Sequence, residues 1–292
     1  MPDFLVKIIT FLVSIVSGTA LLFAPATKAI VKTTGEYAES FDQVVYDDDR
    51  LVPEKDADGN WTFTTDRTLK VVQITDVHIG GGSFAIKRDK RALNAVAAML
   101  TYEKPDLVIF TGDMVYPVPF QSGTFNNSIS TQIFINFMEK LGVYYTVCFG
   151  NHDSELYGTH DRGAISDMYA DPSLKYCLYQ RGPENITGYG NQIIKVKNSD
   201  GIVTNAYFIF DSNTYTDGDL LGIQWKYDNI HEDQVQWYRD SVLAIDAENK
   251  KADPDYPMFT SLAFFHIPLE EYGIAWNEYK ANGYKDTENV KY

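Results

Sequence analysis

Short apolar runs alternate with helical patterns through the middle of the chain. Residues 87–104 and 131–142 carry apolar side chains at helical spacing, and Pro105 and Gly142 end these two predicted helices. Three runs rich in β-branched and aromatic residues flank them and are typical of buried strands: residues 69–74, 106–110 and 143–149. This alternation predicts a parallel α/β sheet.

A different pattern follows in the second half of the chain. Two apolar runs, 191–197 and 206–210, lie close together and predict an antiparallel pair of strands. Helical spacing at about 232–247 and an apolar run at 258–265 predict one more helix and one more strand.

The chain before these elements divides into two segments. In residues 1–29 one lysine, Lys7, precedes an apolar run that small residues follow, which predicts a signal peptide cut after Ala29. An uncleaved membrane anchor is the alternative, because the run is nearly long enough to span a bilayer. Either one implies a secreted or extracytoplasmic protein that contacts membrane only through this segment. Residues 30–67 are acidic and turn-rich, so we interpret them as a lead-in to a domain at residues 68–292.

Composition narrows the function. The 292 residues are 45% hydrophobic, which is enough for a sizeable core, and their formal net charge is −15. Such a surface disfavours nucleic acid as a partner, since phosphate backbones are bound by Lys and Arg. An acidic protein can still bind a small phosphate ester where metal ions reverse the local charge. The two cysteines form neither a disulfide scaffold nor a zinc motif.

Potential metal ligands follow four of the predicted strands. Because carboxyl ends of strands form the ligand-binding edge of open α/β sheets, we expect these side chains to converge. Taken alone, an aspartate after a glycine is more typical of a turn than of a site, and a single histidine is more typical of a core. Their joint occurrence favours a site. The residues are Asp76 and His78, then Asp113, then Asn151, His152 and Asp153, and finally His266.

These residue types suit a centre of two metal ions. Asp76 and His78 are two positions apart and can face one side, while the carboxylate of Asp113 can bridge two cations. With the amide oxygen of Asn151 and the imidazole of His266, the set favours Fe, Mn, Zn or similar ions, divalent or mixed-valence. Two ions about 3.5–4 Å apart activate water and bind a phosphoryl oxygen.

The motifs "DVH", "GD", "GNHD" and "FFHIP", in this order, resemble the motif blocks of the calcineurin-like metallophosphoesterases. "GDMVY" also resembles the GDxxY block of purple acid phosphatases, and "YFIFDSNTY" and "NIHEDQVQWYRD" resemble a single-domain branch of that group. The resemblance implies a four-layer αββα sandwich. It also implies hydrolysis of phosphate esters, phosphomonoesters first, by a hydroxide that two metal ions activate.

The resemblance assigns a role to each matching residue. It makes His152 the acid that protonates the leaving oxygen and Asp153 the residue that orients His152. The implied ligands are Asp76 and His78 for one metal, Asn151 and His266 for the other, and Asp113 as the bridge.

Two features depart from the purple acid phosphatase pattern. Those enzymes have glycine where this chain has His78, and their GDxxY tyrosine binds ferric iron. Here we expect His78 to be the ligand and Tyr116 to pack nearby. The family also ends in a GHxH block, and no histidine follows His266. We therefore expect either a piece of a longer protein or a centre with fewer ligands.

Two functions remain open from the sequence. The first is a dinuclear metallophosphoesterase, whose activity in this chain alone we expect to be weak. The second is a non-catalytic secreted or surface binding protein on the same scaffold, which the missing GHxH block favours. A nuclease is a third reading, and the acidic charge counts against it.

Overall fold

The computed structural model describes residues 33–47, 50–216 and 226–291. The predicted signal peptide or anchor, residues 1–29, lies outside this part of the chain. Within it, no helix is both long enough and apolar enough to cross a membrane. The chain folds into two compact units whose segments interleave along the sequence. The first unit comprises Met1–Val52, Arg67–Val147 and His152–Gln180, and the second comprises Pro53–Asp66, Cys148–Asn151 and Arg181–Tyr292.

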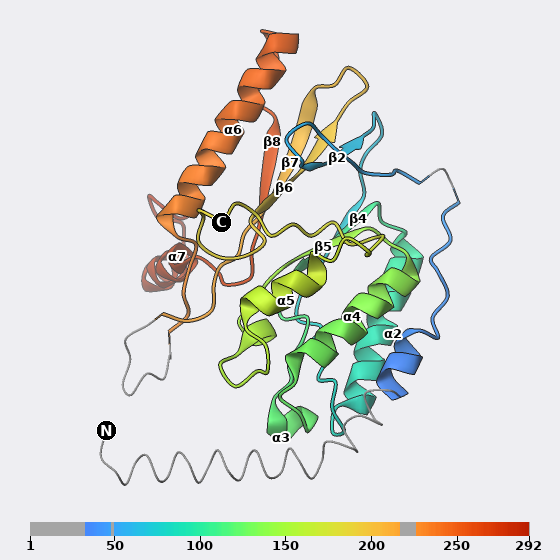
Figure 1. The fold of residues 1–292 in the computed structure, drawn as a ribbon. Coiled ribbons are helices and arrows are strands. Elements are labelled where there is room, and N and C mark those ends of the chain that lie inside the picture. Colours follow the sequence, from blue (N-terminus) through green and yellow to red (C-terminus); the bar gives the residue numbers. More distant parts are fainter. Residues whose placement is uncertain (1–32, 48–49, 217–225, 292) are drawn as a thin grey trace. The chain divides into compact units, whose positions relative to one another are not determined.

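A three-stranded sheet in the order β3–β4–β5 forms the centre of the first unit (Figure 1). Strands β3 and β4 are parallel, and every residue of β4 is buried, as the continuous apolar run predicts for a central strand. The bounds are Val71–Ile74 for β3, Leu107–Thr111 for β4 and Tyr145–Cys148 for β5.

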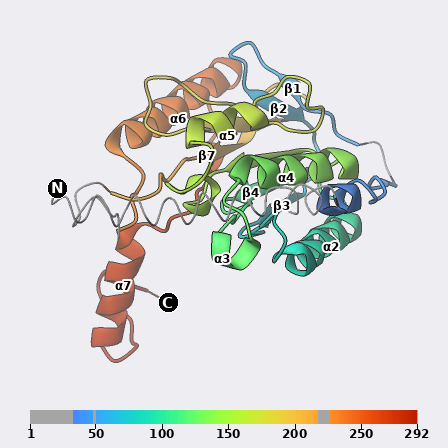
Figure 2. The ribbon, with the colours of Figure 1, turned by 60° about the horizontal axis from the view of Figure 1, so that its bottom comes forward.

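Capping residues at the helix ends explain where helix α4 of the first unit begins and ends. Asn126 caps α4 by accepting the backbone N–H of Ile129, and Gly142 ends it in the left-handed conformation. Helix α4 packs on the sheet, where Phe134 meets Phe110 of β4 edge to face at 4.9 Å (Figure 2). The bounds are Ile86–Glu103 for α2, Pro119–Ser122 for α3, Asn127–Leu141 for α4 and Arg162–Tyr169 for α5, with a 3₁₀ turn at His152–Ser154.

The second unit holds a mixed sheet in the order β1–β2–β6–β7–β8. The predicted antiparallel pair is confirmed as β6 and β7, and β8 runs parallel to β7. The strand before His266 therefore belongs to a different sheet from β3, β4 and β5. The bounds are Glu54–Lys55 for β1, Trp61–Thr64 for β2, Gln192–Lys197 for β6, Val203–Ile209 for β7, Thr260–Phe264 for β8, Glu232–Ala252 for α6 and Glu270–Ala281 for α7.

The segment interpreted as a lead-in, residues 30–67, contributes two strands to this sheet. Strand β2 pairs in parallel with β6, and β1 pairs with β2 around a turn that the Asp56 carboxylate organises. Two short strands of four residues or fewer leave too little periodicity for detection from sequence.

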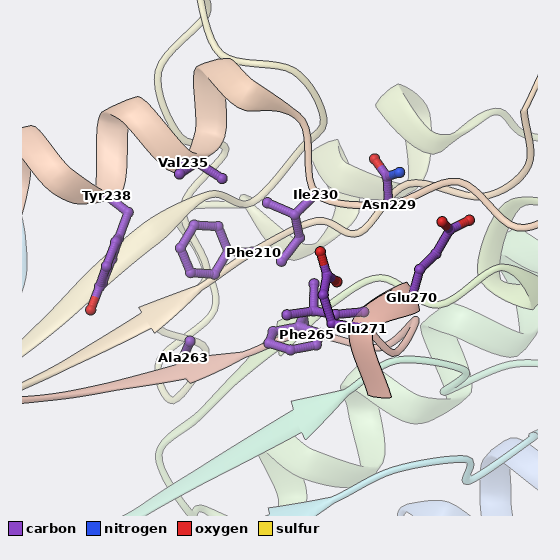
Figure 3. Close-up of a pocket in the computed structure, with 10 residues that line it drawn as sticks. Phe210, Asn229, Ile230, Val235, Tyr238, Ala263, Phe265, Glu270 and Glu271 are labelled. Carbon is purple, nitrogen blue, oxygen red and sulfur yellow. The ribbon is translucent and has the colours of Figure 1, made fainter. Parts of the chain in front are cut away.

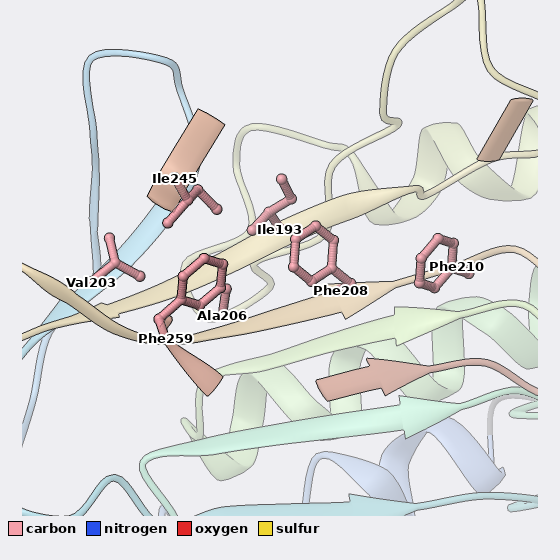
Figure 4. Packing of buried hydrophobic residues seen from close by; sticks show 7 residues of the cluster. All are labelled: Ile193, Val203, Ala206, Phe208, Phe210, Ile245 and Phe259. Atoms are coloured by element: carbon pink, nitrogen blue, oxygen red, sulfur yellow. The ribbon is translucent and has the colours of Figure 1, made fainter. Parts of the chain in front are cut away.

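Alternate residues of β7 and Phe210, which follows its last residue, contribute to the apolar core of the second unit (Figure 4). Ala206, Phe208 and Phe210 share one face because the side-chain period of a strand is two. Helix α6 covers this face, and its Tyr238 meets Phe208 at 4.7 Å between ring centres. The end of β7, which leads into the 211–215 loop, is therefore fixed by packing against α6.

Candidate metal centre

Backbone hydrogen bonds join the turn after β3 to the turn after β4. The N–H of Asp76 donates to the carbonyl of Gly112 at 3.1 Å, and the N–H of His78 donates to the carbonyl of Asp113 at 3.0 Å. A parallel bridge between Ile79 and Val115 continues the pairing. The strand ends of the first unit thus bring the predicted ligands into one place, as the strand-end argument requires.

Three side chains of these turns point at one another. Nε2 of His78 lies 3.3 Å from Oδ1 of Asp76 and 3.2 Å from Oδ2 of Asp113. The two carboxylates also have oxygens within 4.8 Å of each other. Asp113 is buried, so its charge has little water to stabilise it. A carboxylate pair beside an imidazole nitrogen is a donor set that a cation stabilises.

The same three residues have unusual backbones. Asp76, His78 and Asp113 have φ of +58°, +53° and +56°, in the left-handed region that residues with a Cβ adopt at a cost. Such conformations cost about 1–3 kcal/mol each and cluster at functional sites. The surrounding fold therefore holds these three residues in a backbone conformation that they would not prefer in isolation.

The loop after β5 is fixed to the turn after β4. Asp153 accepts the backbone N–H groups of Asp113 and Val115 at 2.9 and 3.0 Å. The N–H of His152 donates to Oδ1 of Asp113 at 2.9 Å. Oε1 of Glu155 lies 2.7 Å from Nδ1 of His152, and the role of Asp153 in orienting that ring stays a prediction.

The surroundings of His152 favour its charged form. Burial of the ring opposes protonation, but the hydrogen bond to Glu155 and the negative charges of Asp113, Glu155 and Asp153 outweigh it, so the pKa of His152 is raised. A raised pKa favours the protonated ring, and a protonated imidazole suits a general acid.

Glu155→Gln is expected to lower kcat about 10-fold or more, because an outer carboxylate that orients a functional ring is worth that much. The amide carries no charge, so the pKa of His152 falls. If His152 acts as an acid, activity is present below its pKa and is lost as the pH rises through it. The high-pH limb of the kcat profile should therefore move to lower pH. A profile that keeps its position would argue against this role for Glu155.

The remaining predicted ligands meet within the second unit. Oδ1 of Asn151 lies 3.3 Å from Nε2 of His266, and the amide nitrogen of Asn151 donates to the hydroxyl of Tyr215 at 2.9 Å. That second bond fixes which way the amide points. The N–H of Ile267 donates to Oγ of Ser212, which secures the turn after β8. The loop at residues 211–215 thus contributes Tyr215 as a neighbour of Asn151.

The second unit also contains a cavity of about 410 Å³ (Figure 3). Its wall includes Phe265, the neighbour of His266, together with Phe210 and Tyr238. None of the ten described lining residues is Lys, Arg or His, while Glu270 and Glu271 add negative charge. This cavity is therefore unsuited to bind a phosphate group.

Comparison with known proteins identifies the family. The family model described as calcineurin-like phosphoesterase matches residues 69–292. The chain belongs to this family. Calcineurin-like phosphoesterases bind a dinuclear metal centre and act on phosphate esters, so membership supports hydrolase chemistry of the phosphatase type.

Curated relatives of this calcineurin-like phosphoesterase include proteins named as probable inactive purple acid phosphatases and one named as a phosphatase. "Probable inactive purple acid phosphatase 14" of Arabidopsis thaliana is 27% identical over 241 residues, covering 73% of this chain and 56% of that protein. "Phosphatase DCR2" of Saccharomyces cerevisiae is 28% identical over 229 residues, covering 72% of this chain and 36% of that protein. The chain thus spans about half, or less, of the length of these relatives.

Among solved structures, a dimetal phosphatase from Danio rerio is similar, with 13% identity and a TM-score of 0.43. The match covers 70% of this chain and 71% of that one.

Proposed function

We propose that the chain is a metal-dependent phosphoesterase that hydrolyses phosphate esters, with phosphomonoesters as the first candidates. The observation that carries the proposal is the convergence of Asp76, His78 and Asp113 on one point, with left-handed backbones at all three. Membership of the calcineurin-like phosphoesterases supports the same chemistry.

The proposed centre takes Asp76 and His78 as ligands of one metal and Asp113 as the bridge. Asn151 and His266, whose donor atoms face each other, are the proposed ligands of the other metal. Oxygen and imidazole donors fit Fe, Mn or Zn.

Bound in this way, the two ions would supply a hydroxide at neutral pH and neutralise charge on the phosphoryl group. The chain's own groups do the rest. Glu155 holds Nδ1 of His152, and Nε2 of the same ring, 3.9 Å from Oδ2 of Asp113, is the proposed donor of a proton to the departing alcohol. Asp153 keeps the turn of Asp113 and the loop of His152 in register through its two backbone hydrogen bonds.

The test is metal analysis combined with turnover. The purified chain is loaded with Mn²⁺, Zn²⁺ or Fe, its metal content is measured, and hydrolysis of 4-nitrophenyl phosphate is followed before and after chelation. We expect two ions per chain and a phosphatase activity that chelation removes and metal restores. A chain that binds no metal would defeat the proposal.

One alternative has specific support. Relatives named "probable inactive" favour a non-catalytic binding protein on the same scaffold. In that case the chain binds metal and phosphate but turns over no ester. Export through residues 1–29 is proposed for either function, and cleavage at Ala29 on expression in a secreting host would test it.

A further inference from the structure

Three rings cluster at the proposed metal site of the first unit. The ring of Tyr116 stacks on that of His78, with centres 5.0 Å apart and planes 30° apart. It also contacts the ring of His152, at 4.2 Å between centres. The two imidazoles meet edge to face at 5.7 Å. A proposed ligand and the proposed acid therefore share one aromatic neighbour.

The backbone of Tyr116 is fixed to the segments that carry both histidines. Its N–H donates to the carbonyl of Ile79, one residue after His78, at 3.0 Å. The preceding residue, Val115, donates its N–H to Asp153, one residue after His152. The backbone that carries the phenol ring is thus hydrogen-bonded to both of the segments that carry the histidines.

We propose that Tyr116 is a positioning residue that acts through the face of its ring, which holds the imidazoles of His78 and His152 at the angles that metal binding and proton transfer require. The proposal rests on the phosphoesterase function proposed above. A ring stacked face to face on a ligand presents its π face to that ligand, and the contact does not use the hydroxyl.

The physical basis is the softness of imidazole rotation. The torsion that turns a histidine ring about its Cβ–Cγ bond is broad, so a ring without a packed neighbour samples many orientations. Hydrogen bonds fix one point of each ring here, at Nε2 of His78 and Nδ1 of His152. The ring of Tyr116, at 30° to the plane of His78 and tilted by 55° against that of His152, restricts the rotation that remains, as close support of functional side chains requires.

The experiment compares Tyr116→Phe with Tyr116→Leu. Phenylalanine keeps the ring and removes the oxygen, and leucine removes the ring while keeping an apolar side chain. Tyr102→Leu, an exposed tyrosine of α2, is the matched control. Three readouts are measured: affinity for Mn²⁺ and Zn²⁺ without substrate, the visible spectrum after loading with ferric iron, and kcat.

We expect Tyr116→Phe and Tyr102→Leu to match the parent in all three readouts. Tyr116→Leu should lose about 10-fold or more in metal affinity and in kcat, with an unchanged melting temperature of the metal-free protein. Two results would overturn the proposal: Tyr116→Phe as impaired as Tyr116→Leu, or a visible tyrosinate-to-iron band that disappears in Tyr116→Phe. Either one would assign the role to the oxygen.

The readouts separate this proposal from the enzymatic one. If the parent binds metal but hydrolyses no ester, the phosphoesterase assignment fails, and metal affinity and the iron spectrum still decide the role of the ring. If Tyr116→Leu binds metal as tightly as the parent, the ring is dispensable and the positioning role is wrong. A parent that binds no metal would defeat both.

Discussion

Asp113→Asn is expected to lower kcat about 100- to 1,000-fold. Metal ions supply several kcal/mol of charge stabilisation in the transition state, and each 1.36 kcal/mol corresponds to a factor of ten in rate. Asp113 is the proposed bridge between the ions, and a neutral amide oxygen bridges two cations poorly. Metal content should fall below two ions per chain, which metal analysis measures.

The same change should leave the metal-free fold intact. Asparagine keeps an oxygen for the N–H of His152 and tolerates the left-handed backbone at this position. It also removes one of two negative charges that lie within 4.8 Å of each other. The metal-free melting temperature should therefore stay the same or rise, whereas added metal should raise it less than in the parent.

Asp171→Asn provides the control for charge alone, because Asp171 is an exposed aspartate in the first unit. It should bind metal and turn over as the parent does. Full activity in Asp113→Asn with two bound ions would remove the carboxylate bridge from the mechanism.

The parts of this fold that could be predicted from sequence are those where one physical signal dominates. The continuous apolar run of β4 and the capped, Gly-terminated α4 were predicted because burial and end chemistry agree there. Strands β1 and β2 were missed because they are held by pairing with a strand far along the chain. No local pattern in four residues records such a partner.

The residues of the candidate site likewise fall into those that a sequence signal predicts and those that it does not. Asp76, His78 and Asp113 could be predicted because each follows a strand, and topology brings strand ends together. Glu155 was missed, although its position three residues after His152 matches the i, i+3 contact across the 3₁₀ turn. Tyr215 depends on the path of a loop, for which no periodic signal exists.

His152→Ala is expected to lower kcat about 100- to 10,000-fold for an alkyl phosphate, the range of general acid–base catalysis. The loss should be much smaller for 4-nitrophenyl phosphate, because nitrophenolate departs without a proton. Metal content should not change, since His152 is not among the proposed ligands and its backbone N–H, which bonds to Asp113, remains. The measurement is the ratio of kcat for the two esters in parent and variant.

His160→Ala is the matched control, because His160 is an exposed histidine in the same unit, and its backbone N–H, which donates to Asn127, survives the change. It should leave both esters unaffected. An equal loss for the alkyl and aryl esters in His152→Ala would mean that the imidazole binds the phosphate and does not protonate the leaving group. Since the raised pKa of His152 comes from Glu155 and its neighbouring carboxylates, the alkyl ester should also be the substrate on which Glu155→Gln acts more strongly.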